Sequence, residues 1–230
     1  MKEALTQSVF FGVAISLIAY EIGLWVKKKW KVALANPLLI AVLIIVAVLL
    51  LFHIDFETYN NGAKYISFFL TPATVSLAVP LYRQLELLKK YPKAIFGGIA
   101  AGVLTAMVSI LILSIAFDLN HEQYVTLLPK SITTAIGMGI SDKMGGVVTI
   151  TVVCICITGI LGNICAETVC KIFKIEDPIA MGLAIGTSAH ALGTTKAMEM
   201  GEIEGAMSSL SIVVAGILTV VSVSVFANFL

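Results

Sequence analysis

The sequence is short of charge. Only 13% of its 230 residues are Asp, Glu, Lys or Arg, whereas a soluble domain typically carries about a quarter. With 59% hydrophobic residues and a mean hydropathy of +1.01, the chain lacks the polar side chains to cover itself in water. The net charge of +1 gives no reason to expect a nucleic-acid partner. These shortages predict a multi-span membrane protein whose solvent is the bilayer.

Clusters of metal ligands and catalytic groups are also lacking. The four cysteines, Cys154, Cys156, Cys165 and Cys170, form no C-x-x-C pair, so neither a metal site nor a disulfide is expected. The sequence pairs no carboxylates and places no nucleophile beside a base. We therefore expect no cofactor, no metal and no enzymatic activity.

What the sequence does have is a series of long apolar runs. The first is followed, not preceded, by the charged "KKKWK" (27–31), so it is interpreted as a retained helix and not as a signal peptide. Basic loops at 27–31 and 83–93 alternate with acidic or neutral ones, which orients the first segments with the N-terminus outside. The predicted fold is an all-α polytopic bundle of about seven to eight membrane segments. The runs cover residues 6–26, 37–54, 63–82, 94–117, 128–141, 147–166, 178–195 and 207–230.

The chain is predicted to form a single membrane domain, 1–230, of two repeated halves at about 1–117 and 124–230. The match of "AGVLT" (101–105) with "AGILT" (215–219) carries this prediction, and internal repeats are common in transporters.

Whether the halves are parallel or inverted depends on 128–146. If that segment crosses the membrane, the loop 171–177 is external. If it dips in and returns, that loop is cytoplasmic and the acidic 199–204 is external. The sequence leaves both open.

Three segments interrupt the pattern of plain spanning helices. "LTPATVSLAVPLY" (70–82) has two prolines inside an apolar run, "PKSITTAIGMGISDKMGG" (129–146) mixes hydroxyls with glycines, and "AIGTSAHALGTTKAMEMGEIEGA" (184–206) contains a histidine and a lysine. A broken helix persists in lipid only against protein or a wet cavity. Its half-helix N-termini favour an anion, so we expect discontinuous helices around a site for a small carboxylate.

The candidate site combines "TPAT" (71–74) with "GTSAHALGTTK" (186–196) and with hydroxyls of 129–146. His190 is the sharpest residue, because an ionisable group inside an apolar run is functional by default and a histidine can carry or relay a proton. The predicted substrate-binding residues are Thr71, Pro72, Thr74, Ser131, Thr134, Gly186, Thr187, Ser188, His190, Gly193, Thr194 and Lys196.

Each of these residues also has a plainer interpretation. Serine and threonine hydroxyls can bond to carbonyls of their own helix, and His190 can be a neutral ring bonded to a carbonyl of a neighbouring helix. Lys196 and Lys130 stand at segment ends, where lysine extends to the lipid headgroups.

Two motifs connect the chain to a known family. "LLPKSITTAIGMGIS" (127–141) and "AIGTSAHALGTTKAMEMGEIEGAMSSL" (184–210) closely resemble signatures of the LrgB/CidB family, also called antiholin-like or YohK-type proteins. The resemblance covers nearly the whole chain. It implies a multi-pass protein of the bacterial inner membrane, usually paired with a small LrgA/CidA-type membrane partner.

The resemblance implies two kinds of function. One is a holin/antiholin-like pore or regulator of murein hydrolase export and autolysis. The other is transport of small carboxylates, such as pyruvate, or glycolate and glycerate in the related plastidal translocator. The carrier is our primary hypothesis, with a proton as a candidate coupling ion, because many broken, buried helices are a costly way to line a wide hole. A homodimer is expected by analogy with carriers that need an anchored scaffold.

Overall fold

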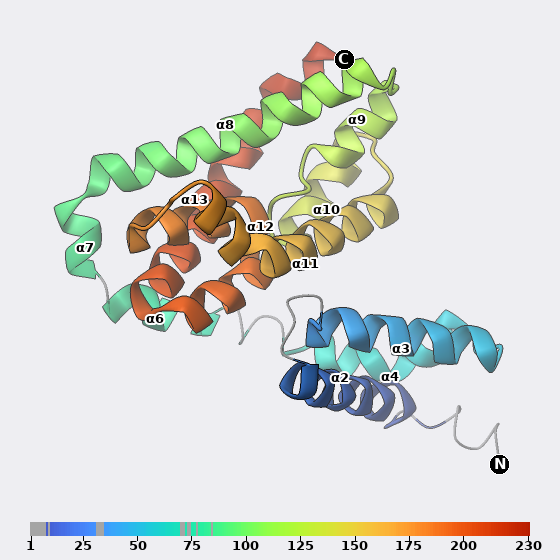
Figure 1. Ribbon diagram of the computed structural model, residues 1–230. Coiled ribbons are helices and arrows are strands. Elements are labelled where there is room, and N and C mark those ends of the chain that lie inside the picture. The colour runs from blue at the N-terminus through green and yellow to red at the C-terminus, as the bar shows by residue number, and fades with distance from the viewer. Residues whose placement is uncertain are drawn as a thin grey trace. The chain divides into compact units, whose positions relative to one another are not determined.

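The computed structural model describes residues 8, 10–30, 35–69, 72, 75, 76, 78–83 and 85–230, and the regular elements of this part are helices. The chain divides into two compact units, Met1–Ser76 and Leu77–Leu230. Figure 1 draws the first unit in blue to cyan and the second from cyan-green to red.

Four helices in the described part are long and apolar enough to cross a bilayer. They are α2 (Phe10–Trp30), α8 (Pro92–Ala116), α11 (Val148–Ile172) and α13 (Glu202–Phe226) with its short continuation η1 (Ala227–Phe229). These helices confirm the helical membrane character predicted from composition. The larger count of seven to eight segments stays a prediction.

The first unit is a packed group of three helices. It consists of α2, α3 (Pro37–Leu51) and α4 (Phe56–Ser67). Gly12 of α2 lies directly against the backbone of Tyr59, and a Cβ at Gly23 would lie 2.5 Å from the Pro37 carbonyl oxygen. Small residues on α2 therefore let both neighbouring helices approach its backbone.

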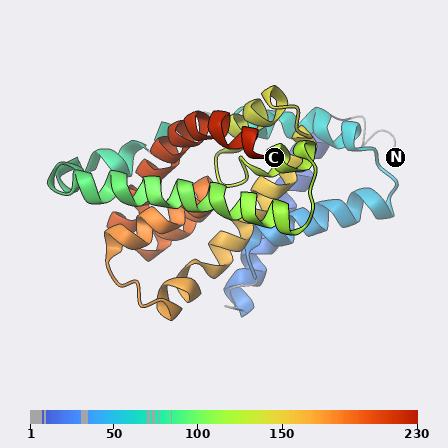
Figure 2. The same ribbon diagram turned by 90° about the horizontal axis from the view of Figure 1, so that it is seen from above.

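The second unit is built around the three 25-residue helices α8, α11 and α13. Its elements are α6 (Ala78–Arg83), α7 (Leu85–Lys90), α8, α9 (His121–Leu127), α10 (Thr134–Lys143), α11, α12 (Pro178–Met200) and α13. The first part of α8 packs with the first part of α13 in one apolar cluster, and their last turns pack in another. The two helices therefore run in the same direction, and α8 crosses over α12 and α13 in the view from above (Figure 2).

Residues 121–147 form the first hairpin, in which α9 enters and α10 returns. The backbone N–H of Val147 donates to the hydroxyl of Thr126 at 2.8 Å, and Thr151 Oγ1 donates to the Thr126 carbonyl at 2.9 Å. Both ends of the segment 128–146 therefore lie at Thr126. Of the two alternatives left open by the sequence, the structure has the one in which this segment dips in and returns.

Residues 178–200, the helix α12, form the second hairpin. Its backbone leaves the helical region at His190, where φ is 42° and ψ is −140°. A Cβ at Gly193 would lie 3.2 Å from the Ile185 carbonyl oxygen, although eight residues of straight helix would separate them by about 12 Å. The interruption predicted for 186–196 is confirmed, and it lies at the histidine itself.

The second hairpin changes the expected topology. Met181 and Met200, from its two ends, line the same cavity as Lys171 and Glu204. The sequence left the sides of 171–177 and 199–204 open, and this cavity places both at the same end of α11. The reason is that the apolar run 178–195, expected to cross, turns back at His190.

Three helices end in the same way. At Phe117, Asp118 and Leu119 the N–H groups donate to carbonyls at 2.9, 3.3 and 2.9 Å, and the middle residue has a positive φ of 51°. The end of α11 at 173–175 repeats this pattern with 3.0, 3.3 and 2.9 Å, and the end of α3 at 52–54 repeats it with 3.0, 3.3 and 2.9 Å. Each is a left-handed cap that satisfies the last carbonyls of its helix.

Candidate functional site

The tips of the two hairpins meet at one turn of α11. Nε2 of His190 lies 3.1 Å from the carbonyl oxygen of Ile155, and the side chain of the same isoleucine packs against Gly137 of the first hairpin. His190 is 3% exposed and Ile155 is fully buried. The middle of α11 therefore holds the tip of one hairpin by its backbone and that of the other by its side chain.

The contact with Ile155 assigns the tautomer of His190. A carbonyl oxygen only accepts, so Nε2 carries a proton and donates it. In the neutral ring Nδ1 is then the acceptor, and a second proton would make the ring a cation. This contact is the one that the plainer interpretation expects. It uses Nε2 alone, so Nδ1 is the ring nitrogen that can still accept a proton.

Lys130 lies beside this tip. Its Nζ donates to Ser131 Oγ at 3.0 Å, and its ammonium interacts electrostatically with both the Cys154 thiol and the His190 ring. Within the part of the chain that the structure describes, no carboxylate forms an ion pair with it. A half-buried ammonium without a counter-ion is costly in a membrane protein unless an anion approaches it.

Two half-helices begin near the middle of α11, where Gly137 and His190 both contact Ile155. The helix α10 starts at Thr134 with Thr133 as its N-cap, and the second arm of α12 starts directly after His190. The first turn of a helix leaves backbone N–H groups without intrahelical partners, and its dipole favours negative charge. Together with Lys130, these N-termini form a positive region where the hairpins meet.

The predicted hydroxyls divide into two groups. Thr187 Oγ1 donates to the Leu183 carbonyl at 2.7 Å, and Ser188 Oγ donates to that of Ala184 at 2.7 Å, so both bond to their own helix as the plainer interpretation holds. Thr194 does more, because its hydroxyl also lies 2.7 Å from Ser208 Oγ on α13. It links the returning arm of the second hairpin to the neighbouring helix.

The predicted glycines serve close packing. A Cβ at Gly186 would lie 2.5 Å from the Ser208 carbonyl oxygen of α13, so this glycine lets the entering arm approach that helix. Gly193 permits the two arms of the hairpin to approach each other. Both glycines therefore serve helix packing, and a direct contact of either with a substrate stays a prediction.

The predicted site residues of the first unit are Thr71, Pro72 and Thr74. Thr71 and Thr74 lie outside the described residues, and Pro72, which is exposed, belongs to the first unit. The pairing of "TPAT" with 186–196 therefore stays a prediction.

Lys196 lies away from the tips, at the base of the second hairpin. Its Nζ lies 3.3 Å from Glu167 Oε1 of α11 and 3.5 Å from Glu199 Oε2. Nearby, a cavity of about 450 Å³ opens between the ends of α11, α12 and α13. Its lining includes Glu167, Glu199 and Glu204 along with Lys171 and Lys174. The charge at the tips thus comes from Lys130, which sequence reasoning assigned to the lipid headgroups.

Two further polar groups escaped the sequence analysis as site residues. Asn163 Nδ2 donates to the Leu192 carbonyl at 2.8 Å and to Thr195 Oγ1 at 3.0 Å, which fixes the returning arm to α11. Ser208 is fully buried and faces Thr194. The signal for the serine was the polar "SSLS" at 208–211 inside an apolar helix.

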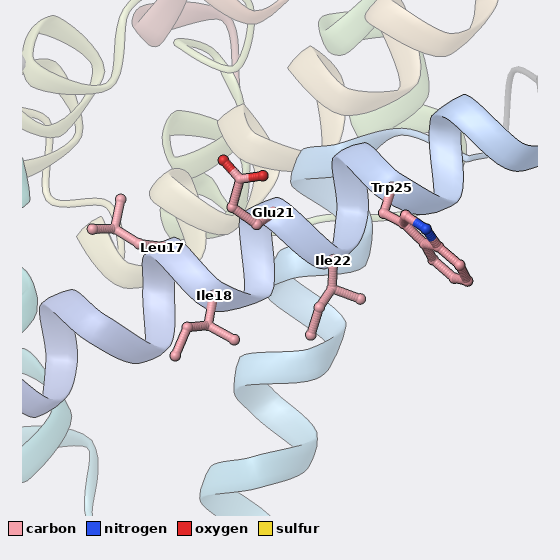
Figure 3. A pocket seen from close by; sticks show the side chains of 5 residues that line it. All are labelled: Leu17, Ile18, Glu21, Ile22 and Trp25. Carbon is pink, nitrogen blue, oxygen red and sulfur yellow. The ribbon is translucent and has the colours of Figure 1, made fainter.

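The first unit carries a separate hollow of about 400 Å³ on one face of α2. Figure 3 shows the Glu21 carboxylate among the apolar side chains that line it, Leu17, Ile18, Ile22 and Trp25. A carboxylate in the middle of a membrane helix is expected to face protein or water. It lies apart from the hairpins in the chain, and no role in the site is assigned to it.

Comparison with known proteins agrees with the two sequence motifs. The model of the LrgB-like family matches residues 16–229. The antiholin-like proteins LrgB of Bacillus mycoides (strain KBAB4) and of Bacillus cereus (strain B4264) are each 39% identical to the chain over 228 residues, which covers 99% of both sequences. No solved structure shows a significant match.

Proposed function

Since the chain belongs to the LrgB-like family, we propose that it is a membrane carrier for small carboxylates of the pyruvate, glycolate or glycerate class. The substrate carboxylate binds where the two hairpin tips meet. It is a membrane protein by its four long apolar helices and by its family, and we place it in the bacterial inner membrane.

The single observation that carries this proposal is Lys130 with its surroundings. The ammonium has no carboxylate ion pair in the described part of the chain, and the N-terminus of α10 and the second arm of α12 begin beside it. A monocarboxylate supplies one negative charge and two acceptor oxygens. It would neutralise the lysine and accept from backbone N–H groups that lack helical partners.

His190 provides the proton in this proposal. With Nε2 held by Ile155, Nδ1 is the nitrogen that takes up or releases a proton. A proton there adds positive charge beside Lys130 and favours binding of the anion, so uptake of substrate and proton would be coupled. We further propose that the carrier forms a homodimer and acts with a small LrgA/CidA-like membrane protein.

The relatives are named antiholin-like proteins, and this name favours a second candidate function, a holin/antiholin-like pore or regulator. Control of murein hydrolase export and autolysis is the form of it that the family resemblance implies. It predicts a different physical behaviour, because a hole for enzymes must pass large solutes. A carrier passes substrate-sized molecules alone.

Uptake of labelled carboxylates into proteoliposomes tests the proposal. The purified chain is reconstituted with and without the small partner and given labelled pyruvate, glycolate and glycerate, with a graded series of trapped dyes as a second readout. We expect saturable uptake of at least one carboxylate and no dye release. Absence of uptake in both preparations would contradict the carrier, and release of large dyes would favour the pore.

A further inference from the structure

Residues 92–147 and 148–203 share a backbone plan. Both begin with a helix of 25 residues, and the two helices start 56 positions apart, at Pro92 and Val148. The left-handed caps that end these helices, at Asp118 and Lys174, are also 56 positions apart and have φ values of 51° and 54°. In each stretch a hairpin follows the cap.

The hairpins also agree at the level of residues. "TAIGMGISDKMG" (134–145) aligns with "HALGTTKAMEMG" (190–201) at the same spacing of 56. A Cβ at Gly137 would lie 3.5 Å from the carbonyl oxygen eight residues earlier, and one at Gly193 would lie 3.2 Å from its equivalent. The glycine that lets the arms approach thus occupies the same place in both.

The long helices carry a related match. "AGVLT" (101–105), "TGILG" (158–162) and "AGILT" (215–219) follow one another at steps of 57 residues in α8, α11 and α13. Their glycines, Gly102, Gly159 and Gly216, each face a residue of one of the two hairpins. The pentapeptide pair noted in the sequence is therefore separated by two steps, with α11 between them.

The two copies have opposite directions. The base of the second hairpin lies with the end of α11, where Lys171 and Met181 line one cavity, and the base of the first lies at the start of α11, where Val147 bonds to Thr126. The hairpins therefore reach the middle of α11 from opposite ends. In a bilayer this arrangement is an inverted repeat.

We propose that residues 92–147 and 148–203 are two inverted copies of one helix–hairpin unit, and that the second hairpin is the cytoplasmic gate of the site, latched by Lys196. The gate deepens the proposed carrier function and rests on it, whereas the inverted repeat does not. The cytoplasmic side is assigned by the lysines near the end of α11 and the basic 83–93 before α8.

The bases of the two hairpins explain why the gate is the second one. In the first hairpin, Ile140 packs in an apolar cluster that includes Leu111 of α8. The positions 56 residues further on are Lys196 and Glu167, which form an ion pair. An apolar core excludes water and resists separation, whereas an ion pair beside a cavity of about 450 Å³ separates at small cost. The equivalent positions are thus apolar in the first copy and form an ion pair in the second. The second is the one that can separate and let water or substrate pass.

Cysteine labelling tests the repeat without any need for transport. In a chain freed of its four cysteines, single cysteines replace exposed residues at the two hairpin bases: Glu176→Cys and Glu202→Cys for the second, His121→Cys and Gly145→Cys for the first. An impermeant maleimide is applied to right-side-out and inside-out vesicles. We expect the cysteines at the base of the second hairpin to label only in inside-out vesicles. Those at the base of the first hairpin should label only in right-side-out vesicles. Labelling of Glu176→Cys and Glu202→Cys from opposite sides would overturn the proposal.

If Glu176→Cys or Glu202→Cys fails to insert into the membrane, the exposed positions Lys174→Cys and Glu199→Cys test the sidedness of the second hairpin in the same way. The same outcome is expected, and opposite-side labelling of this pair would be equally decisive against the hairpin.

The latch is tested in a chain that keeps Cys154 as its single cysteine. In inside-out vesicles, Lys196→Gln should raise the rate of N-ethylmaleimide reaction at Cys154 roughly two- to fivefold, which is what loss of a partly exposed ion pair allows. Lys196→Arg should leave the rate near its original value. Lys171→Gln removes one positive charge from the lining of the neighbouring cavity and serves as the matched control.

An unchanged rate in Lys196→Gln, or an equal rise in Lys171→Gln, would overturn the latch. The labelling pattern and the transport assay are separate readouts. Predicted labelling without carboxylate uptake would refute the carrier alone, and uptake with opposite-side labelling would refute the repeat alone.

Discussion

The two hairpins share the spacing of their glycines and of the caps before them, and they differ in chemistry. The first brings Lys130 to the tip, whereas the residues 56 and 57 positions further on are the small Gly186 and the neutral Thr187. The second places His190 at its tip, where the first has Thr134. One hairpin thus supplies a permanent charge and the other a titratable one. On the proposed repeat, very few changed side chains distinguish the tip that bears Lys130 from the tip that bears His190.

The largest expected effect comes from removing the charge of the first hairpin. Lys130→Gln should lower carboxylate uptake by a factor on the order of 100, because a lost charged hydrogen-bonding partner costs about 2 to 3 kcal/mol or more of anion binding. Lys143→Gln, at the exposed end of α10, removes a charge outside the tip and should leave uptake unchanged. Proteoliposome uptake measures both, and equal behaviour of the two variants would remove Lys130 from the site.

The next effect concerns the tip of the second hairpin. His190→Gly keeps a residue that accepts positive φ and removes the imidazole, so the hairpin should fold while uptake falls roughly tenfold and loses the part of its pH dependence that the imidazole supplies. Uptake is measured from pH 5 to 8. An unaltered pH profile in a folded variant would show that His190 is a structural residue.

A smaller effect tests whether the two hairpins depend on the same glycine. Gly137→Val and Gly193→Val should each destabilise the protein by about 1 to 3 kcal/mol, because a side chain at either position meets the opposite arm or α11. Gly139→Val is the control, since a Cβ there meets nothing within 4 Å. Thermal unfolding in detergent is the measurement. Equal stability of all three variants would contradict the common packing role of Gly137 and Gly193.

The smallest effect is expected at the bond between the second hairpin and α13. Thr194→Val removes the hydroxyl that lies 2.7 Å from Ser208 Oγ and should cost about 1 kcal/mol. Ser208→Ala should cost a similar amount, and the double variant less than the sum, because the two groups share one bond. Additive losses would indicate that the hydroxyls do not interact.

Much of this architecture could be predicted from the residues. Composition predicts membrane helices, and hydroxyls with glycines in apolar runs predict the interruptions, including the one at His190. The turning back of α12 could not be predicted, because a run of apolar residues has the same composition whether it crosses or returns. The decision lies in the backbone of His190 and in the contact between Gly193 and Ile185, which are tertiary.

The two lysines differ in a way that the sequence does not report. Lys130 and Lys196 both end apolar runs, and the sequence analysis included Lys196 and not Lys130 among the predicted binding residues. The difference is whether a carboxylate lies nearby. Glu167 of α11 pairs with Lys196, whereas no carboxylate of the described residues pairs with Lys130. Charge pairing across helices decides the role of each lysine, and periodicity does not report it.

The left-handed caps at His53, Asp118 and Lys174 have a practical consequence. Each places a side chain where an L-residue is strained by roughly 1 to 2 kcal/mol. Glycine at these three positions would relieve that strain without touching Lys130 or His190. The three caps are thus independent positions at which glycine should raise the thermal stability of the protein. Such a variant would suit crystallisation or cryo-electron microscopy, because Lys130 and His190 are unchanged.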